Sequence, residues 1–189
     1  TRSYYCLDGG NFIEIGGGSS IVLLNLTEGY HEITIKAVNS LELEGTSVLQ
    51  FNIDTTPPEL SFSEEGPIYF DGNTVELEWK SEDDISGIGA YYYSINGEEW
   101  KNNGLTSVLE IYLEEGTHEV SVASMDGLGN RIEKSIVVIV DKTDPEISII
   151  SPVPDEYINQ DNLTLELELF DGISGIHFLE YNIDSHGSV

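Results

Sequence analysis

Five oxygen-bearing side chains could together hold a metal ion if the fold brings them to one place: Asp54, Asp83, Asp84, Asp126 and Asn130. Hard cations such as Ca²⁺ take about six to eight oxygen ligands, often from carboxylates, amides and backbone carbonyls. Carboxylates grouped without such an ion would repel one another. The alternative is that each Asp caps its own tight turn through hydrogen bonds from its side chain to the backbone. The sequence has no EF-hand loop to support the ion independently.

Two histidines stand at matching places in the sequence, and each is followed by a glutamate. His31 and His118 therefore resemble the start of a zinc-protease motif, which needs a second histidine four positions later. Ile35 and Val122 occupy those positions, so the motif is absent. Both histidines share the alternation of the neighbouring apolar residues, which favours a buried, hydrogen-bonded corner position.

Three further residues carry groups that act as nucleophiles in enzymes. Ser86 and Ser174 lie in Ile-Ser-Gly-Ile, which lacks the Gly-x-Ser-x-Gly pattern and the following helix of a nucleophile elbow, so we interpret both as turn residues. Cys6 occupies the position of Ser94 and Asn182 in the repeats described below. These polar equivalents predict an outward-facing thiol, with no base beside it.

Two segments match the acceptor pattern for N-glycosylation. They are Asn25-Leu26-Thr27 and Asn162-Leu163-Thr164. Asn162 shares its parity with Glu166 and Glu168, which we expect to face solvent. The two asparagines are therefore candidate glycan sites if the chain is extracellular.

The composition excludes several classes of protein. The chain has 189 residues with 35 acidic and 7 basic side chains, a formal net charge of −28, which argues against binding to nucleic acid or to an anionic membrane surface. Because 39% of the residues are hydrophobic, the chain can bury a core and is not a disordered acidic tail. Its single cysteine excludes a disulfide framework. The longest apolar run, residues 136–140, is too short to span a bilayer.

The sequence repeats itself at an interval of 87 to 88 residues, as Asp54 and Asp141 illustrate. We therefore expect the C-terminal part of one repeat (1–54), one complete repeat (55–141) and the N-terminal part of a third (142–189). The boundaries Asp-Thr-Thr-Pro-Pro and Asp-Lys-Thr-Asp-Pro contain proline, which predicts short, stiff connectors. The interval is carried by residues 51–60 with 138–147, 83–88 with 171–176, 28–33 with 115–120, and 5–8 with 93–96 and 181–184.

Within the complete repeat, apolar residues alternate with polar ones. Val75, Leu77 and Trp79 alternate with charged residues, the pattern of a half-buried strand. No segment shows helix caps around a periodic apolar face. The sequence thus predicts an all-β fold of tandem β-sandwiches. We expect about seven strands per repeat, at residues 59–63, 68–70, 74–81, 89–95, 105–112, 117–124 and 132–140.

Several motifs resemble those of a known group of domains. The connector Asp-Thr-Thr-Pro-Pro, then Asp-x-x-Ser-Gly-Ile, then Tyr-Ser-Ile-Asn-Gly and finally Asp-Gly-x-Gly-Asn are similar to the immunoglobulin-like repeats of large prokaryotic (archaeal or bacterial) surface and secreted proteins. Residues 113–123 are also similar to fibronectin type III domains, with His118 near their corner tyrosine. The resemblance implies an extracellular module that spaces, stiffens or adheres.

This topology bears on the acidic residues. In such a sandwich the connector before the first strand lies at the same end as two of the loops. We therefore expect Asp54, Asp83, Asp84 and Asp126 to converge there, with Asn130. The first repeat has Ala37-Val38-Asn39-Ser40 in place of the Asp-Gly-x-Gly-Asn turn, so no such site is expected in it.

The leading functional hypothesis is a non-catalytic structural or adhesive segment of a long extracellular surface protein, such as a stalk, adhesin, filament or S-layer-like surface coat. The alternative is an accessory immunoglobulin-like region of a secreted enzyme, such as a peptidase or glycosidase, in which Tyr92 would be the candidate surface aromatic residue. An enzyme within these residues is the third hypothesis. The sequence requires no cofactor other than calcium.

The two ends of the sequence leave one question of partners open. Tyr5 and Tyr181 hold equivalent positions, so the last residues re-enter the repeat where the first residues leave it. Neither partial repeat can bury both faces of a core alone. Because the sequence starts at Thr1 without a methionine or signal peptide, we expect a longer parent chain whose neighbouring repeats complete the halves. Alternatively, separate chains complete each other head to tail as a polymer.

Overall fold

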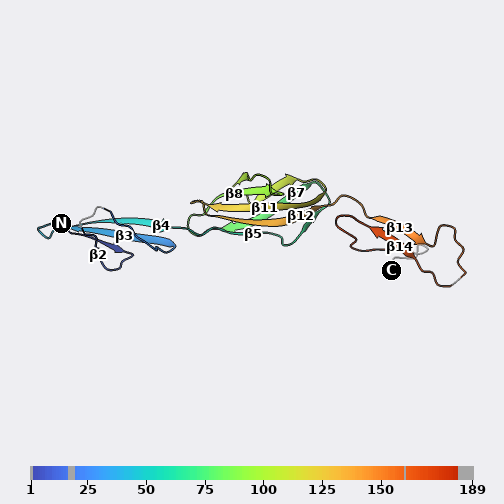
Figure 1. The fold of residues 1–189 in the computed structure, drawn as a ribbon, viewed down its shortest axis with the longest axis horizontal. Helices are drawn as coiled ribbons and strands as arrows, with labels where there is room; N and C mark the ends of the chain where they lie inside the picture. The colour runs from blue at the N-terminus through green and yellow to red at the C-terminus, as the bar shows by residue number, and fades with distance from the viewer. Residues whose placement is uncertain (1, 17–19, 160, 183–189) are drawn as a thin grey trace. The chain divides into compact units, whose positions relative to one another are not determined.

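The computed structural model describes residues 2–16, 20–159 and 161–182, and strands are the regular elements of these residues (Figure 1). The repeated block at residues 181–184 lies partly outside them. The strands are β1 Arg2–Leu7, β2 Ile13–Glu14, β3 Gly29–Val38, β4 Glu44–Ile53, β5 Glu59–Phe62, β6 Ile68–Phe70, β7 Thr74–Glu82, β8 Ile88–Ile95, β9 Lys101–Gly104, β10 Val108–Tyr112, β11 Gly116–Asp126, β12 Arg131–Val140, β13 Glu146–Ser151 and β14 Glu166–Phe170.

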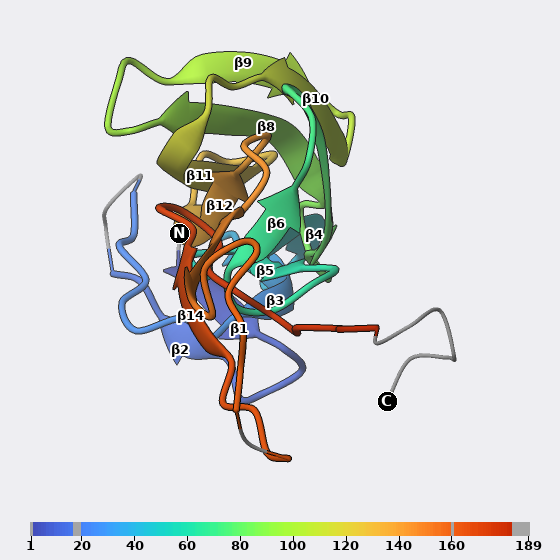
Figure 2. The same cartoon turned by 90° about the vertical axis from the view of Figure 1, so that its right-hand side faces the viewer.

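Strands β5 to β12 form two sheets, which we call the central sandwich (Figure 2). One sheet has the order β10-β7-β5 and the other has the order β6-β12-β11-β8-β9. Strands β6 and β12 run parallel, with Val138 opposite Ile68 and Val140 opposite Phe70. This division of strands between two sheets is that of an immunoglobulin-like sandwich. The predicted all-β, immunoglobulin-like fold class is confirmed.

Alternation along the strands builds the core, as the sequence predicts. In β7, Val75, Leu77 and Trp79 are buried while the charged residues between them are exposed. In β11, Val120 and Val122 are fully buried. The two sheets can therefore cover each other with apolar faces and keep charged side chains on the outside.

The strand count differs slightly from the prediction of seven. The central sandwich has eight strands, because Lys101–Gly104 forms the additional edge strand β9. Its sequence Lys-Asn-Asn-Gly is polar and has no apolar alternation, so the pattern that reveals the other strands is missing. Such a short, polar edge strand also discourages pairing with other molecules.

The N-terminal strands form a single four-stranded sheet with the order β2-β1-β3-β4. The repeat interval relates these strands to β9, β8, β11 and β12, which stand in the same order in the central sandwich. Strands β13 and β14 form an antiparallel hairpin and correspond in the same way to β5 and β7.

Backbone contacts divide the chain into two compact units. The first unit comprises residues 1–60, 81–91 and 123–132, and it holds the four-stranded sheet and the loops that surround the first connector. The second unit comprises residues 61–80, 92–122 and 133–189, and it holds the second connector and the hairpin β13–β14. All side-chain interactions described below lie within one unit or the other.

Apolar residues of the terminal strands are exposed where their equivalents in the central sandwich are buried. Leu49 in β4 is 62% exposed, whereas its equivalent Ile136 in β12 is 7% exposed. Ile147 in β13 is 58% exposed, whereas Leu60 in β5 is 4% exposed. The terminal strands thus carry the apolar faces of a sandwich without the second sheet that covers them.

We expect Trp79→Ala to lower the free energy of unfolding of the central sandwich by about 3–5 kcal/mol, because it removes a buried aromatic side chain and leaves a cavity. The measurement is chemical denaturation of residues 1–189, followed by circular dichroism. As a control, Tyr112→Ala removes an exposed aromatic residue of β10 and should change the stability by about 0.5 kcal/mol or less. A loss below about 1 kcal/mol for Trp79→Ala would contradict its inward placement.

Candidate functional site

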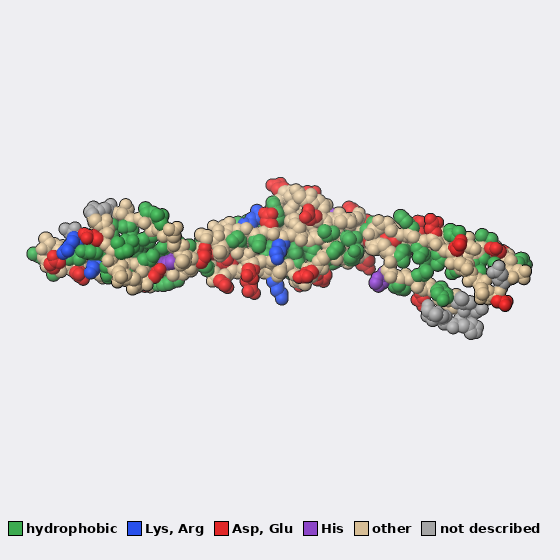
Figure 3. All heavy atoms as spheres, turned by 60° about the horizontal axis from the view of Figure 1, so that its bottom comes forward, with side chains coloured by type: hydrophobic (Ala, Val, Ile, Leu, Met, Phe, Trp, Pro, Cys, Tyr) green, Lys and Arg blue, Asp and Glu red, His purple; other side chains and the backbone are tan. Residues whose placement is uncertain are grey.

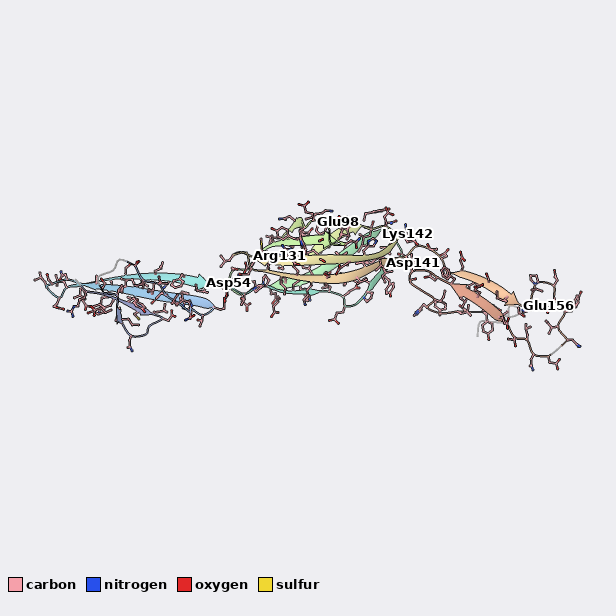
Figure 4. The ribbon with its side chains drawn as sticks, in the orientation of Figure 1. Asp54, Glu98, Arg131, Asp141, Lys142 and Glu156 are labelled. Atoms are coloured by element: carbon pink, nitrogen blue, oxygen red, sulfur yellow. The ribbon has the colours of Figure 1, made fainter. Side chains whose placement is uncertain are left out.

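The first connector begins at Asp54, directly after β4 (Figure 4). Asp54 is 7% exposed. Its Oδ1 accepts long hydrogen bonds from the backbone nitrogen of Thr56 at 3.3 Å and from the hydroxyl of Thr56 at 3.4 Å. Its Oδ2 is buried and has no hydrogen-bond partner. One oxygen of this carboxylate has therefore lost its water without gaining a donor.

Asp83 caps the loop between β7 and β8. Its Oδ1 accepts hydrogen bonds from the backbone nitrogens of Ser86 at 2.9 Å and Gly87 at 2.7 Å, and a longer one from Ile85 at 3.3 Å. These bonds hold the carboxylate in one orientation. Ser86 is thus a turn residue, as the sequence predicts.

Asp126 caps the loop between β11 and β12 in the same manner. Its Oδ1 accepts hydrogen bonds from the backbone nitrogens of Leu128, Gly129 and Asn130 at 2.6–2.9 Å. Its Oδ2 accepts one from the side-chain amide of Asn130 at 2.6 Å. Burial would raise the pKa of Asp126, but the hydrogen bonds from Asn130, Leu128 and Gly129 outweigh it and hold the pKa below its ordinary value.

Two glycines allow these loops to approach each other closely. The backbone nitrogen of Gly127 donates to the carbonyl of Gly87 at 2.9 Å. A Cβ atom at Gly89 would lie 2.4 Å from the carbonyl oxygen of Asp126, and one at Gly127 would lie 2.8 Å from that of Ser86. Only residues without a side chain fit at these two positions, and they bring the loops that carry Asp83 and Asp126 together.

The structure brings three of the five predicted residues together. Asp54, Asp83 and Asp126 each offer one carboxylate oxygen, and these oxygens lie within 4.8 Å of one another. Asn130 joins the group through its amide, which donates to the carbonyl of Asp54 at 3.3 Å and to Asp126. Asp84 is exposed and lies outside the cluster of three carboxylates. Turn capping and clustering thus occur in the same residues.

The second connector has a related arrangement around Asp141, with one difference. Asp141 Oδ1 accepts a hydrogen bond from the backbone nitrogen of Thr143 at 3.1 Å, and its Oδ2 accepts one from the backbone nitrogen of Ser174 at 2.9 Å. Hydrogen bonds from Ser174 lower the pKa of Asp141, and that from Thr143 adds to the effect. Both oxygens of Asp141 are therefore satisfied, whereas Oδ2 of the equivalent Asp54 is not.

The two histidines occupy the predicted corner positions. His31 is buried, and its Nε2 donates to the carbonyl of Thr27 at 2.8 Å. His118 is half-buried, and its Nε2 donates to the carbonyl of Glu114 at 2.8 Å. Each ring thus bonds to the backbone four residues upstream, as a corner tyrosine does in related sandwiches.

The second ring nitrogen distinguishes the two corners. His31 Nδ1 lies 2.8 Å from Asp8 Oδ2, whereas His118 Nδ1 lies 3.2 Å from the amide nitrogen of Asn96. Since carbonyl and carboxylate oxygens only accept, a doubly protonated His31 satisfies both partners. The hydrogen bond to Thr27, followed by that to Asp8, accordingly raises the pKa of His31.

The prediction that Cys6 faces outward is wrong. Cys6 is buried, and its Sγ lies 3.1 Å from the carbonyl oxygen of Gly10. Its equivalent Ser94 is also buried, and its hydroxyl donates to the carbonyl of Glu98 at 2.6 Å. The polar equivalents mark a small side chain that donates to a turn, not an exposed position.

The remaining predicted positions lie as follows. Asn25 and Asn162, the candidate glycan sites, are both exposed. Tyr92 is half-buried. Acidic side chains are scattered over the visible face in Figure 3, among few basic ones. In the described part of the chain, no helix has the length and apolar character needed to cross a membrane.

Comparison with known proteins gives no family assignment. No protein-family model matches the sequence, and no curated protein matches it. Among solved structures, the fibronectin(III)-like modules of Clostridium thermocellum CbhA are 16% identical, with a TM-score of 0.40 over 74% of this chain and 77% of that one. The extracellular cadherin domains 3–6 of protocadherin gamma B2 are 12% identical, with a TM-score of 0.37 over 81% of this chain and 46% of that one.

We expect Asp8→Asn to lower the pKa of His31 toward its ordinary value of 6.5, because the anionic partner becomes neutral while the bond to Thr27 remains. A raised folded-state pKa stabilises the fold fully below pH 6.5, and this contribution is lost as the pH rises through the folded value. NMR titration of the His31 ring measures the shift directly. Asp71→Asn, with the same charge change in the loop after β6, should leave it unaltered, and an unchanged His31 pKa in Asp8→Asn would contradict the assignment.

Proposed function

We propose that residues 1–189 are a non-catalytic structural segment of a long extracellular protein, in which immunoglobulin-like sandwiches follow one another as a stalk, adhesin or filament. The observation that carries this proposal is the repeated fastening of the connectors. Thr55 donates from its backbone nitrogen and its hydroxyl to Glu28, and Thr143 donates from its hydroxyl to Glu115, the equivalent glutamate.

Further bonds support the same interpretation. Asp54 and Asp141 each accept a hydrogen bond from the residue two positions ahead, and Lys142 Nζ donates to Asn73 Oδ1 at 3.1 Å. Connectors held at several points, with proline in their sequence, resist bending more than a flexible linker of equal length. In this proposal each sandwich is a rigid spacer, and the array holds a terminal function away from the cell.

The net charge of −28 fits the same role. Exposed acidic side chains repel neighbouring chains and keep a long array soluble. Because Asn25 and Asn162 are exposed, we also propose them as glycan sites of the extracellular chain.

The partners in this proposal are neighbouring repeats. The four-stranded sheet β2-β1-β3-β4 carries later strands of a sandwich, and the hairpin β13–β14 carries early ones. Their exposed apolar faces, illustrated by Leu49 and Ile147, need the complementary strands as a cover. We propose that adjacent repeats of the parent chain supply them, and that head-to-tail pairing of separate chains is the alternative source.

A chimera tests whether the two end segments are complementary halves. Because Tyr181 and Tyr5 are equivalent, residues 142–180 joined directly to residues 5–54 should form one complete sandwich. We expect a single cooperative unfolding transition and resistance to protease, since each apolar face now has a cover. The separate pieces 5–54 and 142–180 are the controls and should show neither property. A chimera that behaves like its separate pieces would refute the complementarity.

Deletion of residues 55–141 from the parent protein tests the spacer role. The deletion joins Asp54 to Lys142 and keeps the repeat in phase, so the rest of the array should still fold. A strand of ten residues such as β12 spans about 33 Å. We therefore expect the terminal part of the protein to lie about 30–35 Å nearer the cell surface, measured by atomic force microscopy, with its activity in solution unchanged.

The same deletion distinguishes the competing function. If the segment is an accessory region of a secreted peptidase or glycosidase, the deletion should instead reduce activity on the polymeric substrate. Lost activity without a change in distance from the surface would reject the spacer and favour the accessory region.

A further inference from the structure

Asp54 holds a buried oxygen whose hydrogen-bonding needs are unmet. The side chain is 7% exposed, and its Oδ2 has no hydrogen-bond partner. Burying a carboxylate oxygen without a donor is unfavourable, and an unsatisfied buried group in a folded protein calls for an explanation, a bound ion among them. The other oxygen offers little relief, because its two hydrogen bonds are 3.3 and 3.4 Å long.

Two further carboxylates surround this position. One oxygen each from Asp54, Asp83 and Asp126 lie within 4.8 Å of one another. Oxygen ligands lie about 2.3–2.6 Å from Ca²⁺, so two ligands of one ion can be separated by up to about 5 Å. The three carboxylates therefore fit around a single ion of this size, and a cation would turn their mutual repulsion into attraction.

Two of these ligands are already fixed in place. The Oδ1 atoms of Asp83 and Asp126 each accept hydrogen bonds from three backbone nitrogens of their own loops. Asn130 ties Asp126 to the backbone carbonyl of Asp54. Ligands held in this manner lose little conformational entropy when an ion binds.

The second connector provides an internal comparison. Asp141 is the equivalent of Asp54, but the backbone nitrogen of Ser174 donates to its Oδ2 at 2.9 Å. At the first connector, the nitrogen of the equivalent Ser86 donates to Asp83 instead. The loop therefore leaves Asp54 Oδ2 without the donor that Asp141 has, which is the arrangement expected where a cation takes the donor's place.

We propose that Asp54, Asp83 and Asp126 bind one calcium ion, with Asn130 as the residue that positions them. The ion binds the first connector to two loops of the central sandwich. Backbone carbonyls and water would complete the coordination, as is usual for Ca²⁺. This inference goes beyond the proposed spacer role and does not depend on it, because the site is defined by its own geometry.

The test is calorimetric titration of residues 1–189 with calcium chloride, after treatment with a chelator. We expect one saturable site with a dissociation constant on the order of 10⁻⁴ to 10⁻³ M, the range of extracellular calcium modules. The melting temperature should rise with calcium concentration, because the ion binds only the folded state. Magnesium chloride should bind at least tenfold more weakly, since Mg²⁺ is smaller and keeps its water.

Matched variants separate a site from general attraction to an acidic surface. Asp54→Asn keeps the shape of the side chain and should weaken binding at least tenfold. Asp84→Asn makes the same charge change at an exposed residue outside the cluster, and its dissociation constant should stay within about twofold of the unmodified chain. Melting curves in chelator verify that both variants fold.

Three outcomes would overturn the proposal. The first is the absence of saturable binding up to about 10 mM calcium. The second is equal affinity of Asp54→Asn and the unmodified chain. The third is an equal loss in Asp54→Asn and Asp84→Asn, which would mean that calcium responds to the net charge alone. If Asp54→Asn fails to fold in chelator, Asp83→Asn replaces it with the same expected loss.

Discussion

A β-sheet with one apolar face is stable only where a second sheet covers that face, and this constraint organises the whole chain. The central sandwich satisfies it with alternating residues such as Val75 and Val120, both fully buried. The terminal strands repeat the same alternation, yet Leu49 and Ile147 remain exposed. The difference arises from which strands are present and not from residue type, because the equivalent positions are apolar throughout.

The same constraint sets what the ends of the central sandwich can do. Once the strands are held by the core, the loops between them are brought to one end, and their approach is limited by side-chain volume. Gly89 and Gly127 remove that limit, so that the loops of Asp83 and Asp126 meet. His177 occupies the position equivalent to Gly89 in the third repeat. An equally close approach of loops there would require the imidazole to be displaced, so the junctions of this chain are not copies of one another.

Much of the fold could be predicted because its signals are local and periodic. The alternation of Val75, Leu77 and Trp79 with charged residues identifies a strand wherever it occurs, and the repeat interval relates distant segments. Other features depend on three-dimensional contacts that no pattern encodes. The polarity of Ser94 suggested that Cys6 faces solvent, but a turn carbonyl accepts from that position inside the fold. Likewise, only coordinates separate Asp84 from the neighbouring Asp83.

The parallel pairing of β6 with β12 has a consequence for mechanical force. Val138 lies opposite Ile68 and Val140 opposite Phe70, so the first and last parts of the central sandwich are joined side by side. Tension along the chain would pull these two strands in opposite directions along their length. In this shear geometry the interstrand hydrogen bonds share the load and must break together, whereas a hairpin pulled open at one end loses them one at a time. The sandwich is therefore arranged to resist stretching.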